Sequence, residues 1–223
     1  YSLAIRKDVF EAAGVDLSNE SSWTWDDFYE ALKKVKEYTK ADYVWSDGFG
    51  FGSTMNIAAT VYNVTGGYST DGGDWGLKDG TKFDFDKGEF YFADTTDEYK
   101  EYLTMFHKMY EDGLIDPETF TQDTTQAQAK FFRGDSYVLN MNYQIYSDIQ
   151  NGKMQVDGAD LYFLTPPAGS AGQLKVSSAA GRLENGIMIT QNALDELGEE
   201  GFIKMLRFID WLWYSDEGQT LCL

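Results

Sequence analysis

The chain has 223 residues, 43% of them hydrophobic and 16% aromatic, which is enough to bury the core of one large domain or two small ones. Its 37 acidic residues outnumber its 18 basic ones and give a formal net charge of -19 at pH 7. Such a surface repels phosphate backbones and anionic lipids, which argues against a nucleic-acid-binding or peripheral membrane protein. The single cysteine, Cys222, excludes an internal disulfide and any metal site built from several cysteines.

The first elements in chain order are a strand and two helices. SLAI has the composition of a strand, and KDVFEAAG predicts a short helix with Asp8 as its cap. WTWDDFYEALKKVKEYT gives the clearest helix pattern, because Thr24 and Asp27 have capping-box spacing. The buried face of this helix is predicted from an apolar stripe at helical spacing, formed by Trp25, Phe28, Leu32 and Val35.

A glycine-rich, aromatic segment, ADYVWSDGFGFGSTMN, comes next and is predicted to be a loop. Its G-F-G-F-G run is only half of a dinucleotide-binding fingerprint, and no clear strand precedes it. NIAATVYNVTGGY predicts a helix that Gly66 and Gly67 end. A loop and a hairpin are expected from Ser69 to Asp94. The turn candidates are Asp79-Gly80 and Lys87-Gly88, among the alternating residues Phe83, Phe85, Phe90 and Phe92.

The central part of the chain predicts two helices and a strand in close succession. EYKEYLTMFHKMYEDG is an amphipathic helix that Gly113 ends, and Asp116-Pro117 is a typical helix start. In TTQAQAKFFRG, Thr125 and Gln128 have capping-box spacing, and the strand YVLNMN follows. The inward stripe of the first of these helices is expected to contain Tyr99, Tyr102, Leu103, Phe106, Met109 and Tyr110.

The last part of the chain predicts a short helix over 146–151, the strand ADLYFLTPP, a flexible link AGSAGQLK, the strand ENGIMIT and the helix FIKMLRFIDWLWYS. The link is the best candidate for a domain crossing. No window approaches the roughly 18 apolar residues of a membrane-spanning helix. Because the chain opens on Tyr1 without a signal peptide, and SDEGQTLCL starts a short helix without a terminator, we expect a fragment of a longer sequence.

Catalytic motifs are missing from this sequence. The only histidine, His107, falls between apolar positions of a predicted helix and is interpreted as a partly buried structural residue. No G-x-S-x-G elbow, P-loop, H-E-x-x-H or C-x-x-C occurs. Carboxylates are abundant, which leaves a glycosidase with an Asp/Glu pair open. The acidic residues between 71 and 86 do not fit the EF-hand pattern, so they are interpreted as a solvated loop.

Aromatic residues exceed what one core of this size normally takes, with 15 Tyr, 15 Phe and 6 Trp. Several fall in predicted loops, namely Tyr43, Trp45, Phe49, Phe51, Trp75 and Tyr143, near the polar residues Ser53, Thr54, Asn56, Asn142 and Gln144. Asn142 and Gln144 come just after a predicted strand, at the position where α/β sheets present side chains to ligands. Flat apolar rings beside amides and hydroxyls suit a sugar, although packing under a loop is an equal alternative for each ring.

The order of elements resembles the extracellular solute-binding proteins of ABC importers, the family that includes the maltose-binding protein and lipoprotein oligosaccharide receptors. The resemblance rests on T-W-D-D-F, G-L-I-D-P-E, F-F-R-G-D and S-D-E-G, in this order over nearly the whole chain. It implies an α/β, periplasmic-binding-protein-like (class II) lobe in an incomplete two-lobe architecture. Residues 1–167 would form the second lobe from its first hinge strand, and residues 168–223 a truncated return segment toward the first lobe.

Ligand contacts follow from the resemblance segment by segment. In maltose-binding relatives the segment before the helix that ends in G-G-Y contacts the sugar. These relatives also place an aromatic residue just after the strand that follows G-(D/E), and Tyr143 or Gln144 occupies that position here. The third contribution in the family comes from the loop before the G-I-M-I strand. With the loop residues above, the candidate ligand-binding set is Trp45, Ser53, Thr54, Asn56, Asn142, Tyr143, Gln144, Arg182, Glu184 and Asn185. Some relatives hold calcium after the first long helix, but this sequence lacks the ligand spacing there, so no metal and no cofactor are predicted.

The leading hypothesis is a non-catalytic carbohydrate receptor of a bacterial ABC importer, with permease subunits as partners and no nucleic-acid partner. The resemblance implies an extracellular lipoprotein, or a periplasmic protein, held at the membrane only by an N-terminal lipid anchor outside this chain. The hypothesis from another class is a glycoside hydrolase with an Asp/Glu pair. A carbohydrate-associated surface domain without a transport role is the third.

Overall fold

The computed structural model describes residues 2–48, 54, 58, 59, 61, 62, 64, 81–84, 86–173 and 188–222. Within these, the chain divides into two compact units, Tyr1–Lys175 and Val176–Leu223. The first unit contains a three-stranded sheet and most of the helices, and the second contains two helices. This division does not test the assignment of residues 1–167 and 168–223 to two lobes, which stays a prediction.

The sheet of the first unit is built around its first strand. β1 (Ser2–Arg6) lies between β4 (Val138–Met141) and β5 (Leu161–Leu164) and is antiparallel to both. Ser2 pairs with Met141, and Leu3 pairs with both Asn140 and Leu164. Because of this register, the start of β1 and the carboxyl ends of β4 and β5 meet at one edge of the sheet. All three strands were predicted from the sequence, and all three are confirmed.

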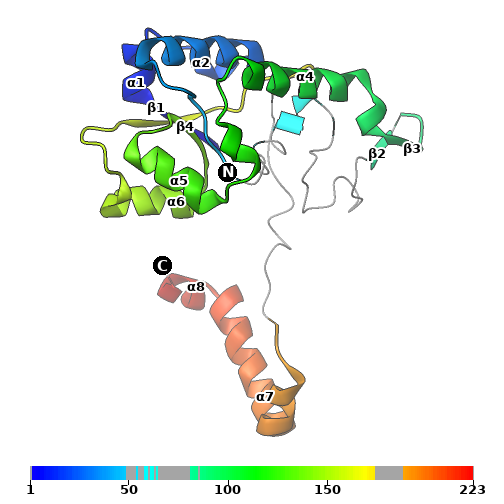
Figure 1. Ribbon diagram of the computed structural model, residues 1–223. Helices are drawn as coiled ribbons and strands as arrows, with labels where there is room; N and C mark the ends of the chain where they lie inside the picture. The colour runs from blue at the N-terminus through cyan, green and yellow to red at the C-terminus, as the bar shows by residue number, and fades with distance from the viewer. Residues whose placement is uncertain are drawn as a thin grey trace. The chain divides into compact units, whose positions relative to one another are not determined.

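Helices cover both faces of this sheet (Figure 1). On one face lie α1 (Lys7–Ala12), α2 (Trp25–Thr39) and α4 (Asp97–Glu111), and on the other lie α5 (Thr124–Arg133) and α6 (Tyr143–Asp148). Each face has its own core cluster, with Leu3 and Ile5 in the larger one and Ala4 in the smaller one. This alternation along β1 follows from the two-residue period of a strand, which sends successive side chains to opposite faces.

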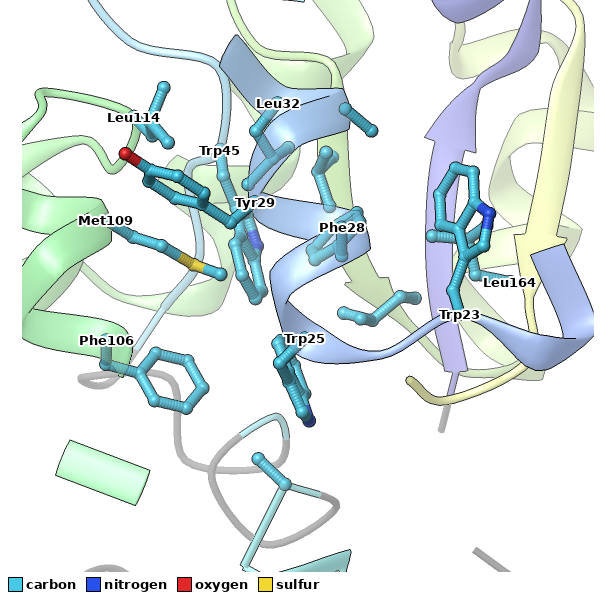
Figure 2. Close-up of a cluster of buried hydrophobic side chains, with 14 of the residues drawn as sticks. Trp23, Trp25, Phe28, Tyr29, Leu32, Trp45, Phe106, Met109, Leu114 and Leu164 are labelled. Atoms are coloured by element: carbon cyan, nitrogen blue, oxygen red, sulfur yellow. The ribbon is translucent and has the colours of Figure 1, made fainter. Parts of the chain in front are cut away.

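The helix α2 forms as its sequence predicts. The Thr24 hydroxyl accepts from the Asp27 N–H, and the Asp27 carboxylate accepts from the Thr24 N–H at 2.8 Å, so the capping box is complete. The helix ends where Lys40 adopts a left-handed conformation with φ of 56°. Its predicted stripe is buried in the core shown in Figure 2 and comprises Trp25, Phe28, Leu32 and Val35.

The helix α4 is confirmed, but its buried face is narrower than predicted. Tyr102, Phe106 and Met109 are buried, while Leu103 and Tyr110 are exposed. The prediction that Leu103 and Tyr110 face inward is therefore wrong, because only one side of the apolar surface of α4 packs against the core. His107 is exposed as well, which corrects its interpretation as a partly buried residue.

Two predicted helix caps are wrong, because both helices begin at other residues than expected. α1 starts at Lys7, which places Asp8 inside the first turn, where its carboxylate pairs with Arg6 instead of capping the helix. α5 starts at Thr124, so its capping box is formed by Asp123 and Gln126 and not by Thr125 and Gln128. At α5 several polar residues compete for the cap position, whereas Arg6, the N-cap residue of α1, forms no cap hydrogen bond through its side chain.

The shorter elements connect these helices and strands. β2 (Thr81–Asp84) and β3 (Glu89–Phe92) form the predicted hairpin, and Asp116 caps the 3-10 helix η5 (Pro117–Phe120) as predicted. The others are the 3-10 helices η1 (Glu20–Ser22) and η4 (Ala93–Thr95) and the π-helix η6 (Ile149–Lys153). The predicted helix ending at Gly66 and Gly67, and the glycine run before it, lie largely outside the described residues.

The second unit contains α7 (Gln191–Tyr214) and α8 (Asp216–Cys222). Both helices were predicted, although α7 begins earlier than expected and is interrupted at Gly198, whose φ is 62°. Among the helices in the described ranges, none has the length and apolar character needed to cross a membrane.

Candidate functional site

The edge of the sheet where β1 begins and where β4 and β5 end carries a pocket of about 260 Å³. It lies beyond the carboxyl ends of two strands, the position at which the sequence predicted a ligand-binding surface. The side chains that line it come from three strands and one helix, together with the residue that joins β4 to α6, and they are Ser2, Met141, Asn142, Tyr143, Tyr146 and Phe163.

Asn142 and Tyr143 are held in place by the start of α6. Asn142 is the N-cap residue, and its Oδ1 accepts from the Ile145 N–H at 3.0 Å. Its Nδ2 donates to the exposed Gln144 side chain at 2.9 Å. Tyr143 occupies the first position of the helix and is 82% exposed. The structure thus confirms that Asn142, Tyr143 and Gln144 follow the strand β4. Asn142 and Tyr143 line the same pocket. Their contact with a ligand stays a prediction.

Thr54 lies inside the protein and not on the pocket surface. Its side chain is 1% exposed, and its hydroxyl donates to Asp47 Oδ2 at 3.0 Å. The same hydroxyl accepts from Asn140 Nδ2 at 2.9 Å. Thr54 is therefore joined to Asn140 of β4, and any influence on a ligand would act through the side chains that it contacts.

Sequence reasoning missed Asp47 and Asn140, which complete this buried chain of hydrogen bonds. Asn140 was visible as an amide between the apolar residues Leu139 and Met141 of the predicted strand YVLNMN, and a polar residue at a buried strand position requires a partner. The partner could not be predicted, because Thr54 lies far away in the sequence.

Trp45 is part of the core (Figure 2). Its ring is 0% exposed, stacks against Trp25 at a centroid distance of 6.4 Å, and meets Phe28 edge-on at 5.5 Å. Its backbone forms isolated bridges to Ile115 and Val138, and residues 40–48 belong to no helix or strand, so the predicted loop is confirmed there although the Trp45 ring is buried. We therefore leave Trp45 out of the proposed ligand contacts.

Five further candidates lie outside the described residues: Ser53, Asn56, Arg182, Glu184 and Asn185. Their roles remain those that the resemblance implies. Within the described ranges, no group of three or more His, Cys, Asp or Glu side chains is placed to hold a metal ion.

Asp47 is the residue of this region with the most perturbed acidity. Burial raises the pKa of its carboxyl from 3.8 to about 7, and hydrogen bonds from the Gly48 N–H and the Thr54 hydroxyl lower it only in part. Between these two pH values the folded state binds more protons than the unfolded state. The free energy of unfolding should therefore fall as pH rises through this window.

An Asp47→Asn variant should remove this pH dependence. We expect the wild-type protein to lose up to about 4 kcal/mol between pH 4 and pH 7 through this group alone, since one pKa unit corresponds to about 1.4 kcal/mol. Urea titrations at several pH values measure the slope, which the substitution should flatten. Asp86→Asn, at an exposed position, serves as the control and should leave the slope unchanged. An unchanged slope in Asp47→Asn would contradict the assignment.

Comparison with solved structures defines the class of the fold. A chitin oligosaccharide binding protein matches with a TM-score of 0.54 and 19% identity, over 77% of this chain and 39% of its own. A sugar transporter from Arthrobacter chlorophenolicus A6, solved with bound laminaribiose, matches with a TM-score of 0.52 and 20% identity, over 77% and 37%. The chain accordingly has a periplasmic-binding-protein-like α/β fold.

The chain belongs to the bacterial extracellular solute-binding proteins, whose family model matches residues 1–219. Among curated proteins it is similar to lipoprotein LipO of Bacillus subtilis (strain 168), with 22% identity over 217 residues. That match covers 89% of this chain and 40% of LipO, so the chain spans about two fifths of the length of this relative.

Proposed function

We propose that the chain is part of the carbohydrate-binding component of a bacterial ABC importer, without catalytic activity. The observation that carries this proposal is the pocket at the sheet edge, where an exposed tyrosine ring stands beside an ordered amide. Rings of this kind stack on the apolar faces of sugars, and amides bind their hydroxyl groups. The sugar-binding names of the similar structures support the same ligand class.

The binding mechanism we propose is closure of two lobes around the sugar. Residues 1–167 would supply one wall of the interlobe cleft and residues 168–223 would return to the other lobe, with Asn142, Tyr143 and Gln144 on the first wall. Closure requires a ligand that binds the closed state more tightly than the open one. Permease subunits are the proposed partners of the closed form.

The proposed location is the outer surface of the cell, with a lipid anchor, or the periplasm. It is supported by the extracellular family and by the similarity to a lipoprotein.

A sugar panel tests the ligand class on the full-length protein. The panel contains chitobiose, laminaribiose and the open-chain polyol D-mannitol, with a dipeptide and an amino acid as non-sugar members. We expect a rise in melting temperature with at least one cyclic sugar and none with the dipeptide or amino acid. A response to the dipeptide or the amino acid alone would contradict the carbohydrate assignment, and cleavage of the added sugar would contradict the absence of catalysis.

Tyr143→Ala should weaken the binding of the responsive sugar about tenfold or more, because it removes an exposed ring from the pocket. Isothermal titration calorimetry measures the affinity. Tyr38→Ala is the matched control, since Tyr38 is also an exposed tyrosine on a helix but lies outside the pocket. Equal affinities of wild type and Tyr143→Ala would exclude Tyr143 from the site.

A further inference from the structure

A second aromatic side chain, Phe163 of β5, lines the same pocket as Tyr143. It is 40% exposed, although it belongs to a strand whose next residue, Leu164, is buried in the core. The sequence identified this strand but gave no reason to assign Phe163 to a ligand surface. Because the Phe163 ring lines the pocket and is partly exposed, it is accessible to a ligand.

The position of Phe163 follows from the strand register. Phe163 pairs with Ala4, which pairs with Leu139 on its other side, so these three side chains share one face of the sheet. That is the face covered by α5 and α6, where Ala4 and Leu139 are fully buried. Phe163 lies on β5, an outer strand of the sheet, where it lines the pocket and the helices cover it only in part.

The Phe163 ring also packs against a second aromatic ring. Tyr146 of α6 meets it edge-on, with 5.3 Å between ring centroids and an angle of 74° between ring planes. Edge-to-face pairs of this kind contribute favourable energy beyond the area that they bury. The aromatic side of the pocket is therefore preorganised, which lowers the entropic cost of binding.

Two polar residues, Asn142 and Ser2, line the same pocket as this ring. Asn142 uses one bond of its Oδ1 and one N–H of its Nδ2 within the protein, which leaves a second lone pair and a second N–H for other partners. The Ser2 hydroxyl donates to the Leu164 carbonyl at 3.1 Å and keeps its acceptor lone pairs. A flat apolar ring that shares a pocket with hydrogen-bond donors and acceptors matches a sugar ring, which has an apolar C–H face and a hydroxyl rim.

We propose that Phe163, held by Tyr146, is a specificity-determining residue that selects cyclic sugars over open-chain polyols. The inference rests on the proposed carbohydrate-binding function and deepens it. A pyranose ring can lay a C–H face against the Phe163 ring, whereas an open-chain polyol has no such face. Tyr143 and Phe163 then bind the same sugar unit from two elements of the fold.

The test compares Phe163→Ala with Phe163→Tyr in the full-length protein, titrated with chitobiose, laminaribiose and D-mannitol. Phe163→Ala should weaken the binding of the cyclic sugars about tenfold or more. Phe163→Tyr keeps the flat ring and should stay within about threefold of the wild type. Any affinity for D-mannitol should change less than that for the cyclic sugars.

The matched control is Phe120→Ala. Phe120 is also exposed and forms an edge-to-face pair with a tyrosine, Tyr110, at 5.7 Å and 76°, but it lies away from the pocket. It should leave every affinity unchanged, and melting temperatures of both alanine variants would show that they are folded. If Phe163→Ala binds cyclic sugars as the wild type does, the inference is overturned and the proposed function stands. If no sugar binds the wild-type protein, the proposed function fails and the inference fails with it.

Discussion

Replacing Trp45 by alanine should lower the free energy of unfolding by about 3–5 kcal/mol, the range observed when large buried aromatic side chains are truncated. The ring is fully buried and lies among Trp25, Phe28 and Phe106, as Figure 2 shows. Its removal would leave a cavity between α2 and α4 that neither helix can close without losing its other contacts. Urea titration of the full-length protein measures the loss.

Two comparisons separate this core role from the ligand contact that the sequence suggested for Trp45. Trp45→Phe should lose less stability, because it keeps part of the ring volume, and the exposed residue Tyr38 should tolerate alanine with little change. Sugar affinity of Trp45→Ala, measured well below its melting temperature, should stay near that of the wild type. A variant with normal stability and lost sugar binding would restore Trp45 to the binding site.

The helices and strands could be predicted where the signals are local. The α2 helix is the clearest case, because both its capping box and its apolar stripe lie within the helix and its N-cap residue, between Thr24 and Thr39. The end of α5 also has a local signal, because the glycine at its C-cap, Gly134, adopts a left-handed φ of 84°. The cap of α5 was misplaced because Asp123 and Thr125 offer the same chemistry, whereas α1 begins after Arg6, which forms no side-chain cap hydrogen bond.

The burial of Trp45 could not be predicted, because it depends on distant parts of the chain. The glycines and aromatic residues around it are typical of a loop, yet its segment hydrogen-bonds to Leu114 and Asp116 and forms bridges to Ile115 and Val138. The narrow buried face of α4 has the same origin. Which of Leu103 and Phe106 is covered depends on the neighbouring elements, and periodicity alone does not contain that information.

The candidate site was half predictable for a related reason. Asn142 and Tyr143 were identified because they follow a strand, which is a local feature of the sequence. Ser2 and Phe163 were missed, because they reach the same pocket only through the pairing of β1 with β4 and β5. A register shift of one residue would have sent Phe163 to the other face, and the sequence does not specify that register by itself.

Replacing Lys130 by methionine should cost about 3–5 kcal/mol at pH 7, because it leaves the charge of Asp116 buried without its cation. Asp116 is 2% exposed and accepts from Lys130 Nζ at 2.7 Å, from the Ser46 hydroxyl at 2.6 Å and from the Glu118 N–H at 3.0 Å. Burial alone would raise the pKa of Asp116, but the hydrogen bonds from Lys130 and Ser46 outweigh it and hold the pKa below its usual value of 3.8.

The direction of the pH dependence follows from this lowered pKa. In the wild-type protein the stabilisation is present above the unfolded pKa and is lost as pH falls through the lower folded pKa. Without Lys130 the pKa of Asp116 should rise, so that acid neutralises the buried carboxylate. The stability deficit of Lys130→Met relative to wild type should therefore shrink between pH 7 and pH 4 in urea titrations.

Two control variants distinguish a buried ion pair from general damage to α5. The double variant Asp116→Asn/Lys130→Met should recover much of the lost stability, since it removes the stranded charge as well. Lys33→Met breaks the ion pair between Lys33 and Glu30, two exposed side chains. It should change stability by less than about 1 kcal/mol. If Lys130→Met costs no more than Lys33→Met, Asp116 is satisfied by Ser46 and the Glu118 N–H, and α5 does not depend on this ion pair for its attachment to the turn before η5.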